Sequence, residues 1–210
     1  MKLLIGVPCV DYMHNEFVKS LTALILKLQR DGVDFTLDIN PGSLIHIARD
    51  KIASKAINEG YTHVLWLDSD MVFGPDLLED LQFCGKSFVT GICASRRPPY
   101  VSCVFSNIDD INHIDRFKEM PSVPFEVRGC GFACVLMETR ILEDVMMSNH
   151  GTCFLPMAAY GEDLAFCIRA RRLGHRIWAD PAVRPGHVSH QAVYYSDAHE
   201  QYMRGLDNHG

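Results

Sequence analysis

Two carboxylates separated by one residue, Asp68 and Asp70, directly follow the apolar run 64–67. A continuous apolar run that ends abruptly in polar residues predicts a strand buried on both faces of a parallel sheet. In open α/β sheets ligands bind at the carboxyl ends of the strands, so both side chains are expected at the binding edge, with Ser69 between them. Carboxylate oxygens suit Mg²⁺ or Mn²⁺, which in turn hold a phosphate. Asp-x-Asp is also a common turn sequence, so the rest of the chain must decide between the two interpretations.

The strand that would carry these carboxylates belongs to a regular series. Strand and helix patterns alternate along the first half of the chain, with strands over 3–7, 35–39, 64–67 and 88–92 and helices over 14–28, 44–56 and 76–81. Successive βα units require right-handed crossovers and build a parallel sheet. We therefore expect an α/β fold, a mostly parallel sheet flanked by helices in a single compact domain.

The pattern becomes less regular after Tyr100. A short strand is predicted over 102–105, and the polar residues 107–122 predict an irregular exposed loop. Residues 126–137 predict a strand in which Gly129 and Gly131 indicate a close backbone approach. The expected elements that follow are helices over 139–147 and 161–173, a strand over 175–179 and a polar tail over 191–210.

Composition excludes several classes of protein. The chain has 210 residues, 48% of them hydrophobic, and a net charge of −6 without any run of Lys or Arg, so no nucleic-acid partner is indicated. Its eight cysteines contain no CxxC pair and lie mostly among apolar neighbours, which is typical of buried thiols in a reducing compartment. The N-terminal apolar run is too short for a signal peptide and no run predicts a transmembrane segment, so we expect a cytoplasmic protein.

Several segments, taken together and in order, resemble the nucleotide-sugar glycosyltransferases of the GT-A fold. They are the first strand and its loop, Asp68 to Asp70, Gly129 to Phe132, Gly161-Glu162-Asp163 at a helix start, and a late histidine. The resemblance is greatest to small inverting enzymes of the family 2 type from phages and microbes. It implies a GT-A type, Rossmann-like domain over 1–190, with a nucleotide-binding half (1–105), an acceptor half (106–190) and a C-terminal tail (191–210).

The resemblance also implies roles for individual residues. The metal, Mn²⁺ or Mg²⁺, would be held by Asp68, Asp70 and His187, with His190 as the alternative histidine. The donor, a nucleoside-diphosphate sugar of UDP or GDP type, would contact Pro8, Cys9, Asp11, Asp38, Arg49, Asp68 and Ser69. The family usually has Asn after the residue that corresponds to Arg49, whereas this chain has Asp50.

Asp163, with Glu162 beside it, would be the catalytic base that accepts the proton of an acceptor hydroxyl on a glycan or another molecule. The position at a helix N-terminus predicts that the dipole keeps Asp163 ionised. Arg128 would orient a phosphate or acceptor group, or pair with a nearby acid, and Arg96 and Arg97 would either reach the sheet edge or lie in a solvated loop. Trp66 is expected in the core, and Trp178 either in the core or as a sugar platform.

The function expected from these residues is metal-dependent transfer of a sugar to a hydroxyl, with inversion. A retaining transferase of the same fold stays open, because only the pair Glu162 and Asp163 indicates inversion. A nucleotidyltransferase of related fold is disfavoured, because the loop after the first strand lacks the glycines that would hold a triphosphate. A sugar- or nucleotide-binding relative without turnover is the alternative from outside the enzymes.

Overall fold

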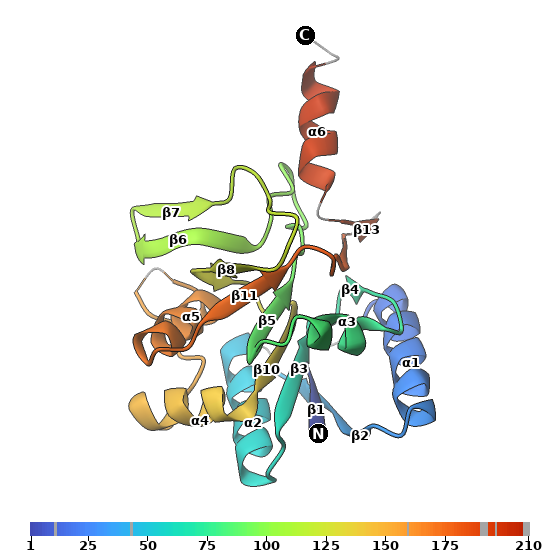
Figure 1. Cartoon of the computed structure of the whole chain (residues 1–210), viewed down its shortest axis with the longest axis vertical. Helices are drawn as coiled ribbons and strands as arrows, with labels where there is room; N and C mark the ends of the chain where they lie inside the picture. Colours follow the sequence, from blue (N-terminus) through green and yellow to red (C-terminus); the bar gives the residue numbers. More distant parts are fainter. Residues whose placement is uncertain (11, 43, 159, 190–192, 196, 208–210) are drawn as a thin grey trace.

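The computed structural model describes residues 1–10, 12–42, 44–158, 160–189, 193–195 and 197–207. Its centre is a sheet of seven strands within these residues, flanked by helices (Figure 1). In spatial order the strands are β2 (Asp34–Pro41), β1 (Lys2–Cys9), β3 (His63–Leu67), β10 (Cys134–Glu138), β5 (Phe88–Gly91), β11 (Ile177–Asp180) and β8 (Phe125–Val127). Strands β2, β1, β3, β5 and β11 run parallel to one another, whereas β10 and β8 are antiparallel to their neighbours. The mostly parallel α/β sheet expected from the sequence is therefore confirmed.

Helices cover both faces of the sheet because its strands carry apolar side chains on both. On one face, Leu4, Val64 and Trp66 pack against α2 (Ile45–Asn58), α4 (Thr139–Ser148) and α5 (Glu162–Arg172). On the other, Leu3 and Leu65 pack against α1 (Asn15–Arg30) and α3 (Leu77–Phe83). Each such side chain that is fully buried contributes roughly 1.5–3 kcal/mol. Trp66 is 0% exposed, so its predicted place in the core is confirmed.

The spacing of apolar residues explains where the first two helices form. In α1 the residues Phe17, Leu21, Leu24 and Leu28 are buried, so one stripe of the helix faces the sheet. The chain leaves α1 through Gly32, whose φ of +69° favours glycine. The predicted helices over 14–28 and 44–56 therefore exist, with boundaries shifted by one or two residues.

Two small sheets complete the fold. Strands β4 (Met71–Val72), β12 (Gly186–Val188) and β13 (Val193–Tyr194) form one, and β9 (Gly129–Cys130), β6 (Val104–Asp110) and β7 (His113–Arg116) form the other. The prediction of an irregular loop over 107–122 is wrong for the first half of this segment, because β6 and β7 form an antiparallel hairpin there. Helix α6 (Ala198–Asp207) occupies half of the segment 191–210 that was predicted as a polar tail (Figure 1).

The strand predicted over 126–137 is interrupted. It is divided into β8, β9 and β10, and these three strands belong to two different sheets. Gly129 lies at the crossing, where an added Cβ would be 2.7 Å from Cδ1 of Ile108. This is the close backbone approach that the glycines indicated.

The eight cysteines are all unpaired, and six of them are buried. Burial raises the pKa of the Cys134 thiol to about 12, which makes this group an inert apolar side chain near neutral pH. Within the described residues, no helix is both long enough and apolar enough to cross a bilayer.

Candidate active site

The carboxyl ends of β1 and β3 meet at a cavity of about 180 Å³. The two strands are parallel, with Gly6 opposite Trp66, so the residues that follow each strand reach the same edge. The cavity is lined by Pro8, Cys9, Val10, Gly42, Ile45, Asp68, Ser69, Asp70 and Arg96. Five of the residues predicted for donor and metal binding, namely Pro8, Cys9, Asp68, Ser69 and Asp70, are thus brought to one place.

His187 is held against Asp70 by strand pairing. Residue 187 lies opposite Met71 in the β12–β4 ladder, and Val188 N donates to the Asp70 carbonyl at 2.8 Å. The imidazole Nδ1 is 2.8 Å from the Ala94 carbonyl, and Nε2 is 3.3 Å from Asp70 Oδ2. Because a carbonyl only accepts, Nδ1 must carry a proton, and Nε2 faces the carboxylate.

The charges of this pair depend on each other. Burial would raise the pKa of Asp70, but the hydrogen bond and charge of His187, with the charge of Arg96, lower it. Burial would lower the pKa of His187, but Asp70 raises it. Each of the two groups therefore stabilises the charged form of the other.

The donor set at Asp70 fits a divalent cation. A metal-binding histidine usually donates its second ring N–H to a carbonyl, which is what His187 does toward Ala94. Within the described residues no three His, Cys, Asp or Glu side chains come close enough to complete a metal site. Mg²⁺ is, however, commonly bound by only one or two protein carboxylates, together with substrate phosphates and water. His190, the alternative histidine, and Asp11 lie outside the described residues.

Arginine side chains form ion pairs with both carboxylates of the Asp-x-Asp segment. Arg96 Nη1 donates to Asp70 Oδ2 at 2.8 Å. Arg49, only 2% exposed, donates from Nη2 to Asp68 Oδ1 at 2.8 Å and from Nη1 to Glu162 Oε1 at 2.6 Å. Arg49 does not line the cavity that Asp68 lines. The structure thus places it behind the carboxylates, where it holds them.

The predicted base, Asp163, lies in the first turn of α5. Its Oδ1 accepts a hydrogen bond from Leu164 N at 2.7 Å, and an added Cβ on Gly131 would lie 3.8 Å from its Oδ2. Burial, followed by the charge of Glu162, raises the pKa of the Asp163 carboxyl. Desolvation therefore opposes the ionised form that the position at the helix N-terminus favours, and the net shift of this pKa is upward.

Asp38, which was implied for the donor pocket, does not line the cavity at Asp70, and neither does Asp50. Asp38 was expected at the end of its strand, but β2 continues to Pro41, and Asp38 forms an ion pair of 3.3 Å with Lys55. Asp50, the departure from the family pattern, accepts hydrogen bonds from the backbone N–H groups of Cys153 and Phe154 at 2.7 and 2.9 Å. Asp50 thus fastens the segment between α4 and α5 to α2.

A second cavity of about 440 Å³ also contains Arg96 in its wall. It is lined by Tyr12, His14, Ser95, Arg96, Arg97, Val188 and Ser189. Tyr12 and His14 were not predicted as site residues, although both follow the carboxyl end of the first strand. The Tyr12 side chain is 74% exposed. The backbone N–H of His14 donates to the Ser69 carbonyl at 3.2 Å. Trp178 makes cation–π contacts with Lys86 and Arg176.

The arrangement can be compared with solved structures. The crystal structure of A197 from STIV superposes with a TM-score of 0.64 at 19% identity, over 94% of this chain and 92% of that one. The catalytic domain of Drosophila beta1,4galactosyltransferase 7, in complex with xylobiose, superposes with a TM-score of 0.52 at 13% identity, over 94% of this chain and 68% of that one. The fold is GT-A-like. No protein-family model and no curated protein sequence matches the chain.

The fold likeness agrees with the resemblance read from the sequence. A GT-A-like fold places its ligands at the carboxyl edge of the sheet, which is where Asp68, Asp70 and His187 gather. At these identities the likeness establishes the fold, and the activity has to be argued from the site.

Proposed function

We propose that this protein is a metal-dependent glycosyltransferase that moves a sugar from a nucleoside-diphosphate sugar to an acceptor hydroxyl, with inversion. The observation that carries the proposal is the contact of 3.3 Å between His187 Nε2 and Asp70 Oδ2 beside the cavity at the ends of β1 and β3. The GT-A-like fold supports it, and so does the link from Asp68 through Arg49 to Glu162, the neighbour of Asp163.

Different residues of the cavity would contact different parts of the donor. The end of β1, with Pro8 and Cys9, would contact the nucleoside, and the diphosphate would lie over Asp68 to Asp70. Asp70 and His187, with Asp68 next to them, would hold Mn²⁺ or Mg²⁺, which supplies the positive charge that a departing diphosphate requires. Arg96 can bond the diphosphate as well, because its side chain is 58% exposed and lies within reach of Asp70.

The acceptor would react on the side of Asp163. As the acceptor oxygen bonds to the anomeric carbon, its proton passes to the Asp163 carboxylate, and the bond between that carbon and the diphosphate oxygen breaks. A raised pKa makes Asp163 a stronger base than an ordinary carboxylate. Direct attack from the face opposite the leaving group produces inversion.

The first experiment is calorimetric titration of UDP, GDP and their sugar conjugates, each with Mn²⁺ and with a chelator. We expect one nucleotide to bind wild type only with metal, and Asp70→Ala to lose that binding. Asp34→Ala removes an equal charge from an exposed position on β2 and should bind as wild type does. Equal affinity with and without metal would contradict the metal assignment.

A second candidate is a binding protein of the same fold that does not transfer sugar. The observation in its favour is that Arg49 and Arg96 already pair with both carboxylates of the segment. It predicts nucleotide binding that is independent of metal and no transfer to any acceptor, so the same titration separates the two functions.

A further inference from the structure

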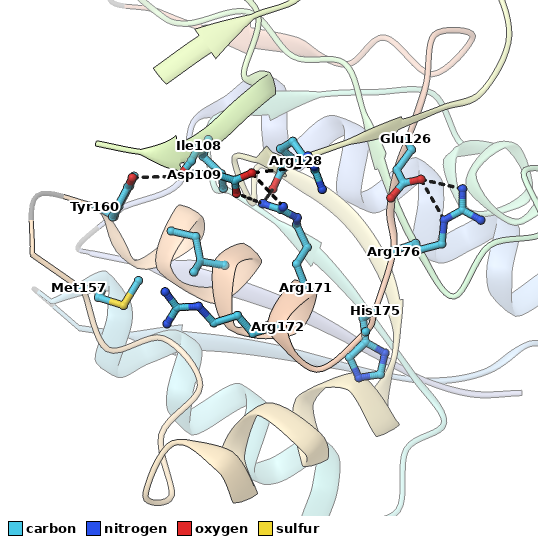
Figure 2. Close-up of a pocket in the computed structure, with 12 residues that line it drawn as sticks. Ile108, Asp109, Glu126, Arg128, Met157, Tyr160, Arg171, Arg172, His175 and Arg176 are labelled. Carbon is cyan, nitrogen blue, oxygen red and sulfur yellow. Dashed lines mark hydrogen bonds and ion pairs between the residues drawn. The ribbon is translucent and has the colours of Figure 1, made fainter. Parts of the chain in front are cut away.

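A cavity of about 410 Å³ lies between the second half of α5 and strands β6 and β8 (Figure 2). It shares no described lining residue with the cavity at Asp70. Its volume is in the range of small-molecule sites, roughly 300–1,000 Å³. The proposed sugar transfer uses none of its residues, so its chemistry can be considered independently.

The wall of this cavity is basic in an otherwise acidic protein. Four arginines line it, Arg128, Arg171, Arg172 and Arg176, against two carboxylates, Asp109 and Glu126. With His175 neutral, four positive and two negative charges leave +2, whereas the whole chain has −6. A local excess of this sign attracts an anion and raises its concentration at the wall.

Pairing within the wall leaves two positive charges uncompensated. The charge of Arg176 is compensated by Glu126, because two of its nitrogens donate to Glu126 Oε2 at 2.9 and 2.6 Å. Arg171 and Arg128 share the single carboxylate of Asp109, at 2.8 and 3.9 Å, and converge on it in Figure 2. The side chain of Arg172 makes no hydrogen bond or ion pair within the described part of the chain.

Helix capping does not account for this cluster. Basic side chains in the last turn of α5 complement its dipole, and that explains Arg171 and Arg172 in part. Arg128, however, lies outside α5, between β8 and β9, and it reaches the same carboxylate as Arg171. The hydrogen bond of 3.4 Å from Arg171 Nη1 to the Arg128 carbonyl keeps the two residues together.

The rest of the wall is mostly apolar, apart from His175 and the Tyr160 hydroxyl. Ile108, Met157 and Ile168 line the cavity, and the Tyr160 hydroxyl is already used, since it donates to the Ile108 carbonyl at 2.9 Å. A ligand that matches this wall has one doubly charged group and an uncharged body. We infer that this cavity binds the phosphate group of a small phosphorylated molecule, with Arg128, Arg171 and Arg172 as its donors, because guanidinium groups bond phosphate through paired N–H donors.

The test is calorimetric titration of the full chain with glucose 6-phosphate, inorganic phosphate and glucose, in chelator so that no metal retains phosphate at Asp70. The variant Arg128→Gln/Arg172→Gln removes the two uncompensated charges. The matched control, Arg30→Gln/Arg204→Gln, removes two exposed arginines outside the cavity. Asp70→Ala tests independence from the proposed donor site.

We expect wild type, the control and Asp70→Ala to bind glucose 6-phosphate alike, and the cavity variant to bind it at least about tenfold more weakly. Tighter binding of glucose 6-phosphate than of inorganic phosphate would show that the apolar wall holds the body of the ligand; equal binding would show that phosphate alone is recognised. Any of three results would overturn the inference. Wild type could show no saturable binding of phosphate, the control variant could lose as much affinity as the cavity variant, or glucose could bind as tightly as glucose 6-phosphate. The single variant Arg172→Gln alters an exposed side chain and repeats the test if the double variant unfolds.

Discussion

Arg49 Nη1 donates a hydrogen bond of 2.6 Å to Oε1 of Glu162, a residue 113 positions later in the chain. The same guanidinium donates to Asp68, so one side chain from α2 ties the end of β3 to the start of α5. The Asp-x-Asp segment and the segment of the predicted base are therefore mechanically coupled. Arg49 acts as a positioning residue for both.

Replacing Arg49 by Met should strongly destabilise the fold. The change leaves the partly buried carboxylates of Asp68 and Glu162 without their partner, and breaking such a pair costs about 3–5 kcal/mol. Urea unfolding measures the loss. Arg30→Met, at an exposed position on α1, should stay within about 0.5 kcal/mol of wild type, and similar losses for the two variants would refute the coupling.

The position of Asp68 and Asp70 could be predicted from the sequence because the signal is local. An apolar run followed by two carboxylates specifies both a buried strand and its polar end, without reference to any distant residue. The same holds for the helix that begins at Glu162, since Gly161 and the acidic first turn are adjacent in sequence.

Contacts between distant segments could not be predicted in the same way. Nothing in the residues of β10 specifies that this strand lies between β3 and β5, because each of its buried positions is simply apolar. The role of Arg49 depends on the packing of α2 near the start of α5. The hairpin of β6 and β7 was missed because β7 is largely exposed and lacks alternating apolar residues.

Asp163→Asn should separate catalysis from stability. Because the pKa of Asp163 is raised in the folded state, the folded protein binds more protons than the unfolded chain between the ordinary value of 3.8 and the raised one. The contribution of this group to the free energy of unfolding therefore falls as pH rises through that window. At pH 7 the variant should be at least as stable as wild type, with the difference vanishing at lower pH.

Transfer by the same variant should fall by at least about 100-fold, the usual contribution of a general base. In wild type, turnover should decline as pH falls through the raised pKa of Asp163. Thermal unfolding and initial rates over pH 3 to 8 measure both effects. Asp34→Asn serves as the control at an exposed position, and wild-type turnover by Asp163→Asn would remove this residue from the mechanism.

Arg96→Gln should increase the affinity for Mn²⁺ in the absence of nucleotide. Arg96 now pairs with Asp70 at 2.8 Å, so a cation must displace its guanidinium to reach that oxygen. We expect a several-fold tighter Kd by titration calorimetry. Arg97→Gln is the matched control, because it removes the same charge from the next residue and leaves the Asp70 pair intact. If both variants raised the affinity for Mn²⁺ equally, the gain would come from the loss of a positive charge and not from the release of Asp70.

Asp50→Ala should lower stability without changing nucleotide affinity. The substitution removes the acceptor of two backbone N–H groups, those of the buried residues Cys153 and Phe154, and each unsatisfied donor costs about 1–3 kcal/mol. Asp50→Asn keeps one acceptor oxygen in nearly the same place and should lose less stability than Asp50→Ala. Urea unfolding and donor titration on both variants separate the two roles. A loss of donor affinity at unchanged stability would contradict this structural role and indicate that Asp50 contacts the nucleotide.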